Sequence, residues 1–213
     1  MEKLQFISQE TEKLTHLQGI QKACEAGVKW IQLRVKDKNE DEVLELAKAA
    51  KQICSLHDCC LIINDYPLIA KKAGANGVHL GKEDMSVAEA RKILGNDFII
   101  GGTANTIEDI ELHSESGADY VGVGPFKFTA TKKKLSPLLG LEGYKKIINE
   151  CMKRNISAPI IAIGGIEIND VKDIMRTGVY GIAVSGLISN SADINTTVKQ
   201  ITDSINTSII TTC

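Results

Sequence analysis

The chain alternates between short apolar runs and longer amphipathic stretches. Between the apolar runs the periodicity is helical: in residues 40–53, for example, Val43, Ala47 and Ala50 fall on one face. The eight apolar runs have the composition of β-strands and lie at 4–8, 30–35, 60–64, 77–80, 98–102, 120–124, 159–165 and 181–186. Strand and helix are therefore expected to alternate along the whole chain.

This alternation predicts the fold class. Strands that are apolar on both faces are typical of a parallel sheet covered by helices. Eight strand–helix units in 213 residues favour a small closed barrel. We therefore predict an α/β fold, a single (β/α)8 TIM barrel over residues 1–213, with a flexible C-terminal tail from about residue 205. A doubly wound open sheet is the alternative.

Composition narrows the function classes. The chain is 43% hydrophobic and 24% charged, as in an ordinary soluble domain, and its net charge of -2 is spread along the sequence. Nucleic acid is therefore not an expected partner. No apolar run reaches the roughly 18 to 20 residues of a membrane-spanning helix, and the start MEKLQFISQE does not have the pattern of a signal peptide. The six cysteines have no metal-type CxxC spacing, so we expect a reduced, cytoplasmic protein with small-molecule partners; homo-oligomerisation stays open.

Polar residues at the end of the second predicted strand form the first candidate site. In a (β/α)8 barrel the active site gathers at the C-terminal ends of the strands. A strand period of two places Gln32, Arg34 and Lys36 on one face. Two cations and an amide suit a diphosphate, because guanidinium gives bidentate hydrogen bonds and ammonium gives a compact charge. The alternative is a solvated strand end.

Acidic residues follow the third and fourth predicted strands. Asn64 and Asp65 end the third, and Asp84 lies in the loop after the fourth. Magnesium prefers a few carboxylates together with substrate phosphate oxygens and water, so Asp65 and Asp84 could hold one ion between them. The alternative interpretation of each residue is a helix N-cap.

Two further segments suit phosphate binding. The loop after the sixth strand carries Thr129, Thr131 and Lys132, and two hydroxyls with a lysine suit a mobile lid that grips phosphate. The seventh and eighth strands end in 164–165 and 184–186, where glycine-containing backbone lets N–H groups approach an anion. The alternative is that these glycines only relieve crowding.

The histidines do not indicate a nucleophilic triad. His79 lies between apolar neighbours in the fourth strand, so we interpret it as a structural or rim histidine. No Ser-His-Asp or Cys-His arrangement emerges, which disfavours covalent acyl chemistry.

Seven motifs in order resemble those of the thiamine phosphate synthase family. They are QLRVK, LIIND, GVHLGKED, IGGT, DYVGVGPFKFTATK, AIGGI and AVSG, and they span about residues 30 to 187. The resemblance implies a Mg²⁺-dependent enzyme that joins a pyrimidine methyl diphosphate to a thiazole phosphate and releases diphosphate.

The resemblance also implies roles for individual residues. The pyrimidine diphosphate would be bound by Gln32, Arg34, Lys36, Asn64 and Lys132, of which Arg34, Lys36 and Lys132 are the catalytic candidates. Asp65 and Asp84 would hold magnesium, and Thr103 would contact the pyrimidine. The thiazole phosphate would be held by Thr129, Thr131, Gly165, Val184 and Ser185.

Three positions differ from the family pattern. The first strand lacks the acidic residue that the family commonly places at its end, and Gln9-Glu10 does not replace it at the same position. Thr103 stands where a serine is typical, and Lys127 is an unusual lysine in its loop. Two alternatives remain: a thiazole tautomerase branch that transfers a proton without joining two substrates, and a noncatalytic barrel that binds phosphate ligands. The synthase is favoured because the chain keeps together the residues expected for the diphosphate and the metal, which are Arg34, Lys36, Asn64, Asp65, Asp84 and Lys132.

Overall fold

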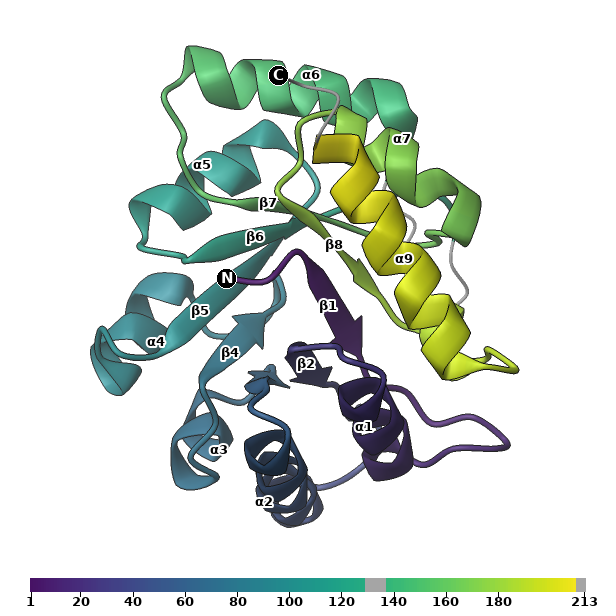
Figure 1. Ribbon diagram of the computed structural model, residues 1–213. Helices are drawn as coiled ribbons and strands as arrows, with labels where there is room; N and C mark the ends of the chain where they lie inside the picture. Colours follow the sequence, from purple (N-terminus) through teal and green to yellow (C-terminus); the bar gives the residue numbers. More distant parts are fainter. Residues whose placement is uncertain (129–136, 210–213) are drawn as a thin grey trace.

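The computed structural model describes residues 1–128 and 137–209, which form a closed barrel (Figure 1). Eight strands pair in parallel in the order β1-β2-β3-β4-β5-β6-β7-β8, and β8 pairs with β1 to close the sheet. Helices surround the strands on the outside. The predicted (β/α)8 barrel is confirmed, and the open-sheet alternative is wrong.

Each predicted apolar run contains or overlaps one strand. The strands are β1 (Leu4–Ile7), β2 (Trp30–Leu33), β3 (Cys60–Asn64), β4 (Gly77–Leu80), β5 (Ile99–Ala104), β6 (Tyr120–Val123), β7 (Ile160–Ile163) and β8 (Gly181–Val184). The helices are α1 (His16–Glu25), α2 (Glu40–Leu56), α3 (Pro67–Lys72), α4 (Val87–Leu94), α5 (Ile107–Glu115), α6 (Gly140–Lys153), α7 (Val171–Arg176), α8 (Gly186–Ser189) and α9 (Ile194–Ile209), with a 3₁₀ turn η1 (Ile168–Asp170) before α7.

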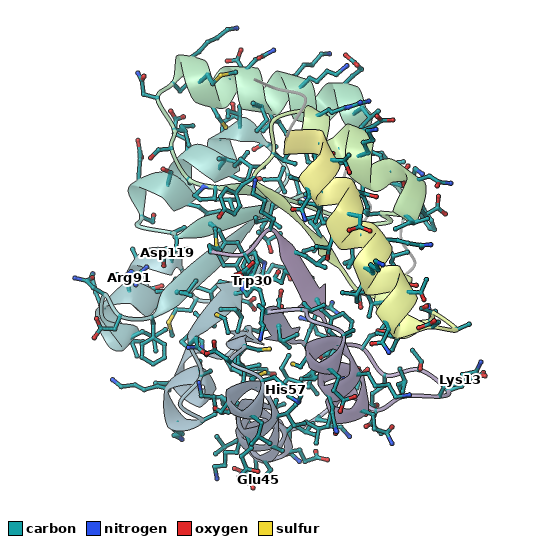
Figure 2. All side chains as sticks on the ribbon, viewed as in Figure 1. Lys13, Trp30, Glu45, His57, Arg91 and Asp119 are labelled. Carbon is teal, nitrogen blue, oxygen red and sulfur yellow. The ribbon has the colours of Figure 1, made fainter. Side chains whose placement is uncertain are left out.

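Two apolar layers follow from the strand period of two. Outward side chains such as Phe6 and Leu61 are fully buried against the helices in one large cluster. Inward side chains fill the barrel, where Trp30 meets Tyr120 edge to face with ring centroids 4.8 Å apart. Trp30 is labelled among the strands in Figure 2. The barrel is a packed core, so ligands are confined to its mouth.

Side-chain hydrogen bonds define the start of four helices and tie α4 to the barrel. Thr15, Asn39, Ser86 and Thr106 each begin a helix with a capping box. On the far side of the molecule from α1, Arg91 of α4 donates to the Asp119 carboxylate at 2.6 Å (Figure 2). Such local bonds hold the outer layer while the strand ends remain available for chemistry.

The last helix closes the outer layer. α9 packs against both α7 and α1, which joins the final unit to the first (Figure 1). Residues 205–209, at the start of the tail predicted from the sequence, belong to this helix. Among the helices that the structure describes, none combines the length and the apolar character needed to cross a bilayer.

Candidate active site

A cavity of about 350 Å³ lies at the C-terminal mouth of the barrel, beside β1, β7 and β8. Four residues predicted from the sequence line it: Arg34, Gly165, Val184 and Ser185. They come from three different strand–loop junctions, so the tertiary fold brings them together as the barrel prediction required.

Gln32 and Asn64 form a buried amide pair between β2 and β3. Gln32 Nε2 donates to Asn64 Oδ1 at 2.7 Å, and the two residues are 2% and 6% exposed. Gln32 Oε1 and Asn64 Nδ2 are buried and have no hydrogen-bond partner among the described residues. An unpaired buried polar atom is costly, so these two atoms are candidates for hydrogen bonds that the described side chains do not supply.

Arg34 and Lys36 lie beyond the strand that was predicted to carry them. β2 ends at Leu33, so the strand period does not extend to these two cations. Arg34 is half-buried; its backbone N–H donates to Ser8 Oγ at 3.2 Å, and the residue lines the cavity. Lys36 is exposed, and its Nζ lies 2.5 Å from Asp65 Oδ2, so it pairs with a carboxylate at the rim.

Asp65 and Asp84 are not helix caps. Tyr66 occupies the N-cap position of α3 without a side-chain bond, and Ser86 caps α4. Asp65 has a φ of 69°, an αL conformation that Asp tolerates better than most residues. The N-cap alternative is therefore wrong for both carboxylates.

The two carboxylates interact with each other. The pKa of Asp84 is raised above its usual range, first by burial and then by a hydrogen bond with Asp65 and the charge of Asp65. The Gly81 N–H, which donates to Asp84 Oδ2 at 2.6 Å, and the charge of Lys36 act in the opposite direction. Two adjacent carboxylates of this kind suit a divalent cation, which would remove their repulsion.

The donor set fits magnesium better than a metal held entirely by protein. Nowhere in residues 1–128 and 137–209 do three His, Cys, Asp or Glu side chains group as metal ligands. Two carboxylates leave most of an octahedral shell to water and substrate oxygens, which is how Mg²⁺ is commonly bound.

A polar network crosses the barrel interior below the mouth. His79 Nδ1 lies 3.0 Å from Tyr120 OH, and His79 Nε2 lies 3.0 Å from Thr103 Oγ1. Gln5 Nε2 donates to the same Tyr120 hydroxyl at 3.3 Å. Burial raises the pKa of Tyr120, so it remains a neutral partner. Thr103 is thereby oriented by His79, in agreement with a structural role for that histidine.

The backbone at the end of β7 approaches its neighbours closely. Gly164 and Gly165 have φ values of +98° and +66°, where side chains are disfavoured. A Cβ on Gly165 would lie 2.8 Å from the Phe128 carbonyl oxygen, and one on Gly164 would lie 2.8 Å from Pro125 Cβ. The crowding that the sequence left as an alternative is real, and the same backbone lines the cavity.

Lys127 has a structural partner. Its Nζ lies 2.8 Å from Asp170 Oδ2 and 3.2 Å from Glu167 Oε2, and its backbone N–H donates to the Gly164 carbonyl at 3.0 Å. The lysine that differs from the family pattern thus ties the loop after β6 to the loop after β7.

Val184 and Ser185 face the cavity in different ways. Val184 is 4% exposed and packs into the outer apolar cluster, so its backbone is the part available to a ligand. Ser185 Oγ donates to Gln9 Oε1 at 3.0 Å. Thr129, Thr131 and Lys132, predicted for the neighbouring loop, lie outside the described residues.

Sequence reasoning gave no ligand role to several lining residues of the cavity, among them two side-chain amides. Gln9, in the loop after β1, and Asn190, directly after α8, both line it. Gln9 was noted from the sequence only as part of a departure from the family pattern, although a polar residue two positions past the first strand was a usable signal. Asn190 follows the short helix α8 and does not lie at a strand end, so its position in the sequence did not mark it as a site residue.

Comparison with known proteins identifies the family. Residues 4–188 match the family model described as thiamine monophosphate synthase. The chain is 51% identical over 190 residues to a thiamine-phosphate synthase of Bacteroides fragilis, covering 89% of this chain and 93% of that protein. It is 53% identical over 189 residues to a thiamine-phosphate synthase of Flavobacterium psychrophilum, covering 89% and 92%.

Solved structures agree. Thiamine phosphate pyrophosphorylase from Pyrococcus furiosus superposes with a TM-score of 0.84 at 28% identity, covering 97% of this chain and 96% of that one. A 3-hexulose-6-phosphate synthase, at 19% identity and a TM-score of 0.67, shares the fold alone; it covers 96% of this chain and 100% of its own. The chain therefore belongs to the thiamine monophosphate synthase family.

Proposed function

We propose that the protein is a thiamine phosphate synthase, a Mg²⁺-dependent alkyl-group transferase. It joins 4-amino-2-methyl-5-(diphosphooxymethyl)pyrimidine to thiazole phosphate and releases diphosphate. The observation that carries this proposal is the Asp65–Asp84 carboxylate pair with Lys36 at one part of the barrel mouth. The other part is a glycine-lined cavity without acidic side chains among its described lining residues. A metal–diphosphate site beside a phosphate site suits a reaction of two anionic substrates.

The chemistry separates into bond breaking and capture. The C–O bond to the diphosphate breaks, and its electron pair leaves with the diphosphate, which gives a resonance-stabilised pyrimidine methyl cation. Arg34 and Lys36 stabilise the charge that develops on the leaving oxygens. Mg²⁺ held by Asp65 and Asp84 would supply further charge neutralisation when bound. The thiazole nitrogen then donates its lone pair to the cation and forms the new C–N bond.

The described polar groups suit the pyrimidine substrate. The unpaired Gln32 Oε1 and Asn64 Nδ2 offer one acceptor and one donor at the mouth. Thr103, held by His79, offers a hydroxyl. No protein nucleophile is required, because capture depends on holding two substrates together and excluding water.

The phosphate of the second substrate is assigned to the cavity. Backbone at Gly165 and Val184, together with Ser185, lines that space. Thr129, Thr131 and the catalytic candidate Lys132 belong to the same proposal and stay predictions from the sequence. We also propose a cytoplasmic location, supported by free thiols at all five cysteines that the structure describes.

The decisive experiment measures diphosphate release from the pyrimidine diphosphate, with and without thiazole phosphate and Mg²⁺, and identifies the product by mass. Release that requires both substrates and the metal, with thiamine phosphate as product, is the expected result. Binding of thiazole phosphate without release would instead favour the tautomerase branch or a noncatalytic barrel and would overturn the synthase.

A further inference from the structure

The side-chain amides of Gln9 and Asn190 enter the cavity from two loops far apart in sequence. Gln9 lies after β1 and Asn190 after α8, and both line the space that Gly165 and Ser185 also line. Neither residue belongs to the motifs that indicated the family.

One hydrogen bond orients the Gln9 amide. Ser185 Oγ donates to Gln9 Oε1 at 3.0 Å, which occupies the carbonyl end of the amide. The Nε2 end has no hydrogen-bond partner among the described residues, and the same holds for the side-chain amide of Asn190. Two N–H₂ groups therefore have donors to offer at the cavity wall.

The two amides converge on one place. A Cβ built on Gly186 would lie 3.2 Å from Asn190 Nδ2 and 3.7 Å from Gln9 Nε2. The two nitrogens therefore lie beside Gly186 and no more than about 7 Å apart, close enough for the oxygens of one phosphate group to accept hydrogen bonds from both. Two amides this close together are the arrangement expected for recognition of an oxyanion without a full positive charge.

The charge of the cavity favours an anion. Among the described lining residues none is acidic, and Arg34 contributes a cation. Ile7, Ile163 and Leu187 supply apolar wall beside these donors. The matching ligand class is an organic monophosphate with a small apolar body.

We propose that Gln9 is a specificity-determining ligand for the phosphate of the second substrate, oriented by Ser185 and assisted by Asn190. The inference rests on the proposed function for the identity of the ligand. It adds two side-chain amide donors to a subsite whose other described polar groups are backbone, the Ser185 hydroxyl and the Arg34 cation. An acidic residue at position 9 would remove a donor and place negative charge against the phosphate.

Calorimetric titration with thiazole phosphate and with the corresponding unphosphorylated alcohol tests this inference. Gln9→Glu should weaken phosphate binding by about tenfold or more, the usual size of a lost hydrogen bond to a charged group, and should change alcohol binding by less than about twofold. Gln9→Met removes the donor at constant charge and should weaken phosphate binding about threefold to tenfold. Asn190→Asp should act in the same direction as Gln9→Glu.

Gln200→Glu is the matched control, because Gln200 is exposed on α9 and outside the cavity. It should leave both affinities unchanged, and thermal unfolding should show that each variant folds. Equal losses for phosphate and alcohol, or no effect of Gln9→Met, would overturn the donor role. So would a wild-type protein that binds neither thiazole phosphate nor inorganic phosphate.

The binding assay separates this inference from the synthase proposal. Phosphate binding that depends on residue 9 without diphosphate release would keep the inference and end the synthase proposal. Normal turnover with unchanged phosphate affinity in Gln9→Glu would do the reverse.

Discussion

The two parts of the barrel mouth differ in the chemistry of the groups that line them. At the ends of β2, β3 and β4, charged side chains meet: Lys36 with Asp65, and Asp65 with Asp84. At the ends of β7, β8 and β1, the wall is glycine backbone, neutral amides and apolar side chains, with Arg34 as the cation that lines it.

This difference teaches how one barrel can separate two anionic substrates. Fixed charges and a metal suit a diphosphate that must leave, because they stabilise charge that develops during the reaction. Neutral N–H donors suit a phosphate that must only be held, because they bind it in both ground and transition states. The first predictions below each act on one part of the mouth, and the last acts on the junction between them.

Asp65→Asn should have the largest effect and should act on the charged part alone. Asparagine tolerates the φ of 69° at this position, so the fold should persist while the metal-binding charge is lost. We expect kcat to fall about a hundredfold or more, since a metal ion typically contributes several kcal/mol of charge stabilisation. Diphosphate release over a Mg²⁺ titration measures this effect.

Asp97→Asn is the matched control for that prediction, because Asp97 is exposed between α4 and β5, at the opposite end of the barrel. It should leave turnover unchanged. Full activity of Asp65→Asn at ordinary Mg²⁺ concentrations would remove Asp65 from the metal site.

Gly165→Ala should instead weaken ligand binding in the neutral part of the mouth. A methyl group here would lie 2.8 Å from the Phe128 carbonyl oxygen, so the cavity wall must shift. Gly74→Ala is the control, because Gly74 has the same φ of +66° with nothing within 4 Å of its Cβ position. Both changes should cost about 1 kcal/mol of stability for the left-handed backbone, whereas Gly165→Ala should in addition weaken thiazole phosphate binding about tenfold.

Calorimetry and denaturant unfolding on the two glycine variants separate backbone strain from the wall shift. Equal ligand affinities in Gly165→Ala and Gly74→Ala would show that the end of β7 does not contact the phosphate.

Lys127→Met should give a smaller effect on the same part. It removes the ion pairs to Asp170 and Glu167 that hold the loops after β6 and β7 together. Because exposed ion pairs contribute little to the free energy of unfolding, stability should change only slightly. The KM for thiazole phosphate should rise about threefold with little change in kcat. Lys145→Met is the control, because it breaks an exposed ion pair within α6, and it should leave KM unchanged. A fall in kcat without a change in KM for Lys127→Met would contradict the positioning role.

The smallest expected effect concerns the junction between the two parts. Ser8 Oγ accepts from the Arg34 backbone N–H and lies 2.9 Å from His16 Nδ1. The pKa of His16 is lowered from 6.5, mainly by burial and further by Lys38 and Arg34, while Glu10 opposes the shift. The unfolded chain therefore takes up this proton first as the pH falls, so the contribution of His16 to stability is lost below about pH 6.5.

Urea unfolding of the wild type and of His16→Gln at pH 7.5 and 5.5 checks this sign. The loss of unfolding free energy between the two pH values should be smaller in the variant, by at most about 1.4 kcal/mol, since the interval extends one pH unit below the ordinary pKa. An identical loss in both proteins would show that His16 does not titrate as its burial indicates.

Much of the barrel and of its charged part could be predicted from the sequence. The β-rich runs locate all eight strands because each strand is buried on both faces and must be apolar. Gln32, Asn64, Asp65 and Asp84 were identified because such side chains are conspicuous at the end of an apolar run. Two details suggested by the local sequence pattern were wrong. β2 ends at Leu33 and does not reach Arg34. The N-cap positions considered for Asp65 and Asp84 are occupied by Tyr66 and Ser86.

What the sequence by itself determined is the alternation of strands and helices, the set of polar residues at strand ends and the family. The tertiary structure alone decided that Gln9 meets Ser185 and that Asn190 shares their cavity, because closure of β8 against β1 joins segments from opposite ends of the chain. It also decided that Lys36 pairs with Asp65 across two strand ends. Periodicity reports which face of its own element a residue occupies, whereas a contact between two loops depends on the curvature and register of the whole barrel.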